Sequence, residues 1–124
     1  MSNFDHHVAV FGASPKPARY ANQAIRLLLK EGYRVTPIHP KFEQIEGLEV
    51  ANTLHGVDQP IHTLTLYVGP QRLAPQIDDI VALRPQRVIF NPGTESEALQ
   101  QALDDAGIEW FEACTLVMLR TDQF

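Results

Sequence analysis

Short apolar runs alternate along the chain with segments in which apolar residues recur at helical spacing. The runs, rich in β-branched and aromatic residues, predict strands at residues 7–11, 34–38, 62–68, 87–91 and 109–113. The helical spacing predicts helices at residues 21–31, 73–83 and 94–106. Because strand and helix alternate with short connections, the pattern predicts an α/β fold in one domain, residues 1–124. Its parallel sheet has about five strands, with helices on both faces.

Residue types at the ends of these elements support the pattern. Gly32 and Gly107 favour helix stops after the first and last predicted helices. Thr94, with Glu97 three residues on, is typical of an N-cap and predicts the start of the last helix. Pro37 removes a ladder donor from the second strand, so we expect strand pairing to weaken from there onward.

Two segments have no clear pattern. Residues 41–57 are expected to hold one helical turn, a short strand near residues 49–52 and a second short turn. The tail includes an apolar stretch, residues 116–119, that either packs across an interface or completes the core. The chain shows no internal repeat and no interdomain linker, which favours one structural unit.

Composition is that of an ordinary globular protein. Of 124 residues, 44% are hydrophobic and 20% are charged, which argues against disorder. The single Cys cannot form an internal disulfide. The first residues lack the features of a signal peptide, and no apolar stretch approaches the roughly 20 residues of a membrane-spanning helix. These features predict a cytoplasmic location and no membrane partner.

Basic residues are in the minority but follow the predicted strands. Ten Lys and Arg against 15 Asp and Glu give a net charge of −5, which argues against nucleic acid as a partner. Yet Lys16, Arg19, Lys41 and Arg72 each come shortly after a predicted strand. The carboxyl ends of parallel strands share one edge of a sheet, where such folds bind ligands. We therefore expect a basic rim that holds an anion.

The loop after the first strand combines a turn glycine with a hydroxyl group. In Gly12-Ala13-Ser14 the glycine permits a tight turn, and Ser14 can donate to an anion. The helix that follows offers unpaired N–H groups, so phosphate is the natural ligand. An ordinary turn with Ser14 as a local cap is the alternative. The segment lacks the second and third glycines of the dinucleotide fingerprint and does not fit the P-loop pattern.

The residues after the second strand argue against NAD. NAD-binding folds commonly place an acidic residue near the end of this strand, where it holds the ribose hydroxyls. Here His39-Pro40-Lys41 brings a cation, and the next acid is Glu43. A cation suits a phosphorylated ribose, which leaves NADP or coenzyme A. A solvated surface lysine is the alternative interpretation.

Two further loops complete the predicted cleft, and their sequences are Val68-Gly69-Pro70-Gln71-Arg72 and Asn91-Pro92-Gly93-Thr94. Both can bring backbone amides close to a ligand, and Arg72 can face a phosphate. Gly-Pro and Pro-Gly are also common turn sequences, and each loop alone favours that interpretation. Together with the first two loops, they predict a binding cleft.

Several motifs, taken as an ordered set, resemble a known family. They are VFGAS, TPIHPK, LYVGP, NPGTES and EACTLVMLRTDQF, and they span nearly the whole chain. The set resembles the small stand-alone CoA-binding domain proteins, which are similar to the amino-terminal domain of the succinyl-CoA synthetase alpha subunit. The resemblance implies a Rossmann-like sheet that binds coenzyme A.

The resemblance implies a role for each loop. Residues 12–14 would hold the pyrophosphate, with Lys16 and Arg19 assisting, and residues 39–41 would border the adenosine and its 3′-phosphate. Residues 68–70 would line the adenine or pantetheine path, and residues 91–93 would lie near the thiol end. Family members often carry Asn before the Pro-Lys pair, where this chain has His39, although imidazole can also stack or donate.

The sequence offers no residue that we assign to catalysis. Cys114 lies after the last strand, either as a thiol near the CoA thiol or as a small buried hydrophobe, and we favour the second interpretation. The five His residues and one Cys show no zinc-ligand spacing, so no metal site is predicted. In the synthetases that the chain resembles, the phosphorylated histidine lies in a second domain. The resemblance therefore implies a binding pocket without ligase chemistry.

The preferred functional interpretation is a non-catalytic protein that binds CoA or an acyl-CoA, as a regulator or a carrier. The alternative is an NADP-binding reductase or a dinucleotide-sensing domain on the same sheet. A structural or interaction protein with a vestigial pocket is a third interpretation. The acyl group, the oligomeric state and any protein partner stay open.

Overall fold

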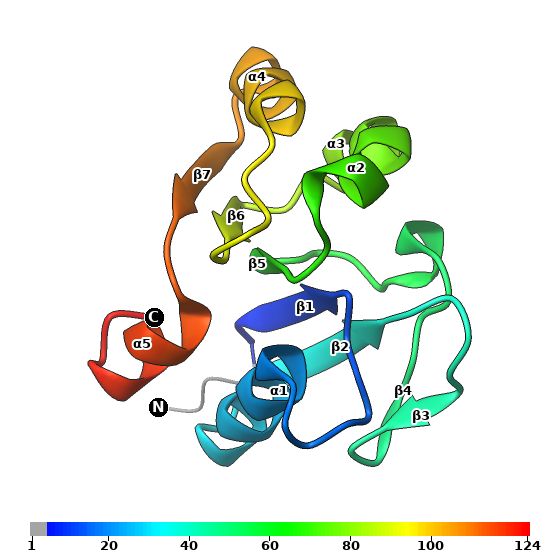
Figure 1. Ribbon diagram of the computed structural model, residues 1–124, viewed down its shortest axis with the longest axis vertical. Helices are drawn as coiled ribbons and strands as arrows, with labels where there is room; N and C mark the ends of the chain where they lie inside the picture. Colours follow the sequence, from blue (N-terminus) through cyan, green and yellow to red (C-terminus); the bar gives the residue numbers. More distant parts are fainter. Residues whose placement is uncertain (1–4) are drawn as a thin grey trace.

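A parallel sheet of five strands forms the centre of the molecule. The computed structural model describes residues 5–124. Its strands are β1 (His7–Phe11), β2 (Arg34–Ile38), β5 (Thr63–Leu66), β6 (Arg87–Phe90) and β7 (Glu109–Glu112). Adjacent strands pair in parallel in the order β2-β1-β5-β6-β7 (Figure 1). The predicted parallel α/β fold is confirmed.

Helices cover both faces of this sheet (Figure 1). One face carries α1 (Tyr20–Lys30) and α5 (Thr115–Arg120). The other face carries α2 (Pro70–Leu73), α3 (Ile77–Leu83) and α4 (Glu97–Ala106), with the short 3-10 turns η1 (Leu54–Gly56) and η2 (Ala74–Gln76). Each helical layer buries its own apolar core against the sheet.

Successive side chains of β1 belong to the two cores in turn. Val8 and Val10 pack with Ile25 and Leu28 of α1, whereas Ala9 belongs to the core on the opposite face. Side chains of a strand alternate between the two faces, and both faces of this sheet are covered, so residues 8–11 of β1 are all apolar. All five side chains are fully buried. A truncation such as Leu28→Ala is therefore expected to cost about 2–5 kcal/mol of stability.

The strand order reverses beside β1. The chain passes from β1 through α1 to β2 on one side, and it then crosses back to β5 on the other side. The loops that follow β1 and β5 therefore leave the sheet toward opposite faces. In open parallel sheets such a reversal leaves a crevice at the carboxyl ends of the strands, and ligands bind there.

The segment between β2 and β5 differs from the sequence prediction. Instead of a helical turn it holds an antiparallel hairpin, β3 (Gln44–Ile45) and β4 (Leu48–Glu49), which turns at Glu46 and Gly47 with positive φ. The short strand expected at residues 49–52 begins earlier, and Ala51 adds only a single bridge to β2. The second expected turn is η1. A two-residue turn leaves no apolar periodicity, so the pattern did not reveal the hairpin.

Pro37 does not weaken the pairing of β2, contrary to the sequence prediction. It lies opposite Val10, and the pairing continues to Ile38. The Pro37 carbonyl accepts a hydrogen bond from the Ala51 N–H at 2.9 Å, so position 37 faces the outer edge of β2. A proline that faces an edge removes no hydrogen bond to the neighbouring strand.

Two helices differ from their predicted residues, because one begins later than expected and the other is divided. The N-cap of α4 is Ser96, whose hydroxyl accepts a backbone N–H at 3.2 Å. Thr94 is not the N-cap, because its hydroxyl donates to a backbone carbonyl of the preceding turn at 2.8 Å. The helix expected at residues 73–83 is divided into α2, η2 and α3, since Pro75 lacks the N–H that a continuous helix needs. The stops at Gly32 and Gly107 are confirmed, both with positive φ.

The tail after β7 forms α5, which the sequence did not predict. Leu116 and Leu119 are buried, and α5 packs against α1. Of the two alternatives for residues 116–119, the structure therefore supports the one in which they complete the core. A helix of six residues is too short for apolar periodicity to identify it.

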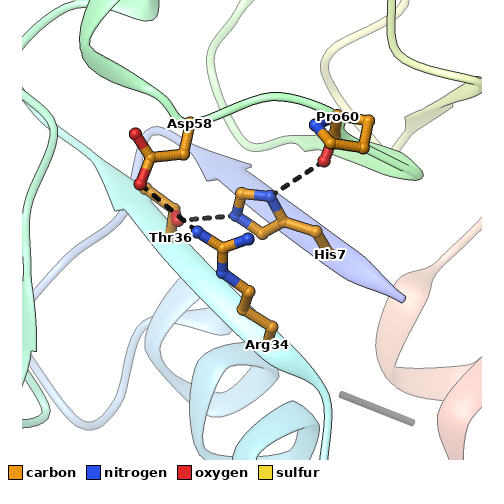
Figure 2. A network of polar contacts seen from close by, with 5 residues as sticks. All are labelled: His7, Arg34, Thr36, Asp58 and Pro60. Carbon is orange, nitrogen blue, oxygen red and sulfur yellow. Dashed lines mark hydrogen bonds and ion pairs between the residues drawn. The ribbon is translucent and has the colours of Figure 1, made fainter. Parts of the chain in front are cut away.

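A polar network ties the amino ends of β1 and β2 to the loop before β5 (Figure 2). The neutral His7 ring donates through Nδ1 to the Pro60 carbonyl at 3.2 Å, and its Nε2 accepts from the Thr36 hydroxyl at 2.7 Å. Arg34 and Asp58 form an ion pair beside it at 3.3 Å. Burial lowers the pKa of His7, which favours the neutral ring. The amino edge of β1 and β2 is thus held by side chains, whereas ligands are expected at the carboxyl edge.

Candidate functional site

A cavity of about 540 Å³ lies at the carboxyl ends of the strands, where the strand order reverses. Its lining comes from the start of α1 and from the loops after β1, β2, β5 and β6, and consists of Gly12, Ala13, Ser14, Pro15, Lys16, Arg19, Tyr20, Ala21, His39, Phe42, Tyr67, Val68, Gly69, Arg72, Pro92, Gly93 and Thr94. We call it the main cavity. Cavities of this size hold cofactors and other small ligands.

Gly12 allows two loops of the main cavity to touch. Its φ is +90°, and a Cβ at this position would lie 2.7 Å from Val68 Cγ2 and 2.9 Å from the Tyr67 carbonyl oxygen. The N–H groups of Gly12 and Ala13 both donate to the Ile38 carbonyl at 3.2 Å. The loop after β1 is therefore fixed against the end of β2 and against the loop after β5. Only glycine fits there, because both its φ and the close backbone exclude a side chain.

The N-terminus of α1 faces the main cavity with unused hydrogen-bond donors. The first backbone N–H that finds a helical acceptor is that of Gln23, which bonds to the Arg19 carbonyl at 3.0 Å. Within residues 5–124, the N–H groups of Tyr20, Ala21 and Asn22 have no acceptor, the N-cap side chain does not cap the helix, and the first turn carries no acid. No acid of α1 itself offsets the positive end of the helix dipole; the Glu46 carboxylate accepts from the Asn22 side chain at 3.1 Å and leaves these N–H groups free, which favours an anion.

The other long helix that begins at this edge is closed to an anion. Ser96 caps α4, and Glu97 places a carboxylate in its first turn. The Gly93 N–H, just before this helix, already donates to the Glu95 carboxylate at 3.0 and 3.2 Å. An anion in the main cavity is therefore drawn to α1 and not to α4.

The main cavity is basic. Lys16, Arg19 and Arg72 line the main cavity, whose described lining includes no carboxylate. The loop that carries Lys16 is held in place, because its N–H donates to Ser14 Oγ at 3.1 Å and Asn22 Nδ2 donates to the Ser14 carbonyl at 2.9 Å. A protein of net charge −5 thus concentrates positive charge at one site. Such a site attracts a polyanion.

A second cavity of about 380 Å³ adjoins the main one. The two share Gly12, His39, Val68 and Arg72. The remaining lining of the second cavity consists of Phe11, Ile38, Pro40, Asn52, Thr53, Leu54, His55, Gln76 and Asp79. The loops after β1, β2 and β5 therefore border two adjoining cavities, one basic and one more apolar.

His39 stands between the two cavities. Its Nδ1 accepts the Lys41 N–H at 3.0 Å, so the proton of the neutral ring is on Nε2. The ring lies 4.5 Å from that of Phe42, measured between centroids. Burial lowers the pKa of His39, and the neighbouring Lys41 and Arg72 lower it further. The imidazole is thus a neutral donor at the junction.

The structure brings most of the predicted site residues together. All of them line the main cavity except Pro40, which lines the second cavity, and Lys41, Pro70 and Asn91, which line neither. Lys41 is exposed, and its backbone, not its ammonium group, supports the site by holding His39. Pro70 is the first residue of α2, where proline is suited to a helix start.

Asn91 lies beneath the site and not in its wall. Its Nδ2 donates to Thr65 Oγ1 at 2.7 Å and to the Leu66 carbonyl at 2.8 Å. Its Oδ1 accepts the Thr115 N–H at 2.9 Å, which anchors the start of α5 to β5 and β6. Asn91 is buried, so this position holds elements together and positions the Pro92-Gly93 turn.

The sequence prediction missed three aromatic residues of the main cavity, which are Tyr20, Phe42 and Tyr67. Tyr20 is 71% exposed at the first position of α1, next to Arg19, and this placement beside a predicted phosphate loop was a usable signal. Phe42 belongs to the segment without a pattern, so no signal marked it. Tyr67 lies within a predicted strand and resembled core; burial raises its pKa to about 12.

Cys114 is half-buried at the N-cap position of α5 and lines neither cavity. The part of the chain that the structure describes brings no three His, Cys, Asp or Glu side chains together as a metal-ligand set. Among residues 5–124, none of the helices has the length and apolar character needed to cross a bilayer.

The fold and the site define the class of protein, which is an α/β domain with a Rossmann-like parallel sheet. Residues 6–120 match the family model described as CoA binding domain, so the chain belongs to this family. The match extends over both cavities and all five strands of the sheet.

Other proteins are similar to this chain. A Thermus thermophilus protein, cell-free ID.343, is 30% identical with a TM-score of 0.87, over 95% of this chain and 90% of that one. The uncharacterized protein YneT of Bacillus subtilis (strain 168) is 21% identical over 100 residues, 81% of this chain and 74% of that protein. The dinucleotide forming acetyl-coenzyme A synthetase 1 of Ca. Korarchaeum cryptofilum, in complex with phosphate and ADP, gives a TM-score of 0.75 at 21% identity. This last match covers 88% of this chain but 26% of the synthetase, and it shows a shared fold.

Proposed function

We propose that this protein binds coenzyme A, free or acylated, in the two adjoining cavities and acts without catalysing a reaction, as a regulator or carrier. The observation that carries the proposal is the uncapped N-terminus of α1, which faces a cavity lined by Lys16, Arg19 and Arg72. Membership of the CoA binding domain family agrees with it. The synthetase whose name includes acetyl-coenzyme A shares the same fold.

The main cavity suits the pyrophosphate. Phosphate oxygens placed before α1 would accept the free N–H groups of its first turn and the Ser14 hydroxyl, and Lys16 and Arg19 would neutralise them. Hydrogen bonds to charged groups contribute about 1.5–3 kcal/mol each. The Pro92-Gly93 turn borders the same cavity, so the pantetheine arm would extend along it toward the thiol end.

The junction of the cavities suits the phosphorylated ribose. Arg72 lines both cavities and lies where the ribose of a nucleotide would join its phosphates. Lys41, the cation predicted for the 3′-phosphate, lines neither cavity, so we assign Arg72 the larger part and Lys41 a position at the rim. The described lining of the main cavity holds no carboxylate to act as a base, which supports a binding role.

Thermal unfolding with added ligand tests the proposal. A ligand that binds only the native state stabilises it by about 2.7 kcal/mol at 100 times its Kd. At equal concentrations CoA, the ligand proposed to bind most tightly, should therefore raise the melting temperature more than dephospho-CoA, NADP or NAD. The double substitution Lys16→Ala with Arg19→Ala should abolish the shift. Lys30→Ala, at the far end of α1 and outside both cavities, is the matched control and should retain it.

Equal shifts for all four ligands, or none, would contradict CoA binding. A larger shift with NADP than with CoA would favour the dinucleotide alternative. Acetyl-CoA incubated with the protein should stay intact when followed by chromatography, and its turnover would contradict the non-catalytic role.

A further inference from the structure

Apolar side chains make up part of the lining of the second cavity. Phe11 and Ile38, from the ends of β1 and β2, line one part, and Leu54 of η1 and Val68 line another. It adjoins the main cavity, with which it shares Arg72 and His39. Its volume of about 380 Å³ and apolar walls suit a flat heterocycle, which buries its faces and leaves its edge for polar contacts.

The polar groups of this cavity include one acid, Asp79 of α3. Its Oδ1 lies 3.1 Å from His55 Nε2, a contact between α3 and η1 in which the Asp79 side chain is 39% exposed and that of His55 is 72% exposed. Within residues 5–124, Asp79 Oδ2 has no hydrogen-bond partner. Asn52 also lines this cavity, and its Nδ2 donates to the backbone carbonyls of His39 at 2.9 Å and Phe42 at 3.0 Å, so its uncharged Oδ1 is the part of the amide that can still accept. The free oxygen of Asp79 therefore offers an acceptor to a ligand.

Charge along the two cavities fixes the direction of a ligand. The main cavity is lined by cations, Arg72 lines both cavities, and the acid Asp79 lines the second cavity and not the main one. With His55, Asp79 also lines a neighbouring cavity of about 300 Å³. A phosphate is attracted to the first chamber and repelled from Asp79, whereas a group with N–H donors is favoured beside the carboxylate. A nucleotide thus enters with its phosphates toward α1 and its base toward α3.

We propose that the second cavity is a base-reading chamber in which Asp79 accepts a hydrogen bond from the exocyclic amino group of a purine, with His55 positioning the carboxylate. The inference rests on the proposed function, since it concerns the nucleotide part of the same ligand. The Asp79 carboxylate would favour adenine over a purine that lacks the 6-amino group. A site built to accept an N–H loses affinity for an analogue that lacks it, because the acceptor is then left unpaired.

Calorimetric titration with two ligands tests this assignment. Adenosine 3′,5′-bisphosphate and purine riboside 3′,5′-bisphosphate differ only in the 6-amino group, and the wild-type protein should bind the first about tenfold more tightly. Asp79→Ala should bring the two affinities to parity. Asp79→Asn keeps a neutral acceptor and should retain a smaller preference. Asp78→Ala, on the same helix but outside both cavities, is the matched control and should keep the full preference.

Equal binding of the two ligands by the wild type would overturn the proposal, and so would a full preference in Asp79→Ala or its loss in Asp78→Ala. If CoA still binds in each of these cases, the proposed function stands while the base-reading role of Asp79 falls. A second measurement is independent of any variant. Nuclear Overhauser contacts between the adenine protons and the methyl groups of Ile38 and Leu54 are expected in the wild-type complex, and their absence would place the base elsewhere.

Discussion

At the scale of single residues, Gly12 determines whether the main cavity exists in this form. Its backbone is left-handed, and the Tyr67 carbonyl and Val68 side chain occupy the space that a Cβ would need. Gly32 has a similar φ of +86°, but a Cβ added there would meet nothing within 4 Å. Substitutions at the two glycines therefore separate the free-energy cost of an unfavourable φ from the cost of a steric clash.

Gly12→Ala is predicted to lower the free energy of unfolding by at least about 2 kcal/mol, because a left-handed alanine costs roughly 1–2 kcal/mol and the loop must also move away from Tyr67. Affinity for CoA should fall with it, since the loop carries the predicted phosphate contacts. Urea unfolding and calorimetric titration measure the two effects. Gly32→Ala should show the cost of φ alone and unchanged CoA affinity; equal effects from both substitutions would contradict the role of the close contact.

At the scale of elements, the free N-terminus of α1 can be tested by supplying the missing negative charge. Tyr20 is the first residue of α1, is 71% exposed and lines the main cavity. Tyr20→Glu places a carboxylate in the first turn, where it should stabilise the helix by about 0.3–1 kcal/mol. The same carboxylate should repel the phosphates and weaken CoA binding at least about tenfold at low salt.

Tyr20→Glu is thus expected to raise the free energy of unfolding and to lower the affinity for CoA. Urea unfolding measures the first effect, and titration at two salt concentrations measures the second. Tyr20→Gln removes the ring without adding charge and is the control. The difference between the two variants isolates the electrostatic part. If Tyr20→Gln weakens binding as much as Tyr20→Glu, the ring and not the helix terminus holds the ligand.

The elements that sequence predicts well are those with a repeated apolar pattern. β1 is a continuous apolar run buried on both faces, and α1 and α4 carry apolar residues at helical spacing. The β3–β4 hairpin and α5 are too short to repeat a pattern, so their apolar residues indicated neither strand nor helix. Pro37 was misjudged because its effect depends on which edge of β2 it faces, and that is decided by the neighbour Ala51.

At the scale of the whole molecule, the sequence predicted which loops line the main cavity, and most but not all of the residues that face it. Loops after parallel strands share one edge, so a common cleft followed from the strand pattern. The orientation of Lys41 and Asn91 depends on contacts across the fold, and these turn Asn91 into the core beside Thr65. The second cavity includes His55 and Asp79, which meet only after the chain crosses from β2 to β5. No local sequence pattern predicts such a pair.

The opposite edge of the sheet carries a histidine cluster that couples folding to pH. His6 Nε2 and His62 Nδ1 both contact Thr63 Oγ1, at 3.0 and 2.8 Å, and their ring centroids lie 3.6 Å apart. Arg87 Nε donates to the same hydroxyl at 2.8 Å. Two imidazoles and a guanidinium therefore meet at one oxygen, and a proton added to either ring would face a neighbouring cation.

Stability is accordingly predicted to fall on acidification between about pH 6.5 and pH 4. Burial, then His62 and Arg87, lower the pKa of His6 from 6.5 to about 4, so the unfolded chain binds more protons than the native protein within this window and gains from them. Because solvent reaches part of the ring and screens the charge, the loss from His6 is expected to be about 1 kcal/mol. Urea unfolding at pH 7.5 and pH 4.5 measures it. His6→Gln should flatten the dependence; a slope that persists in His6→Gln would assign the effect to other groups.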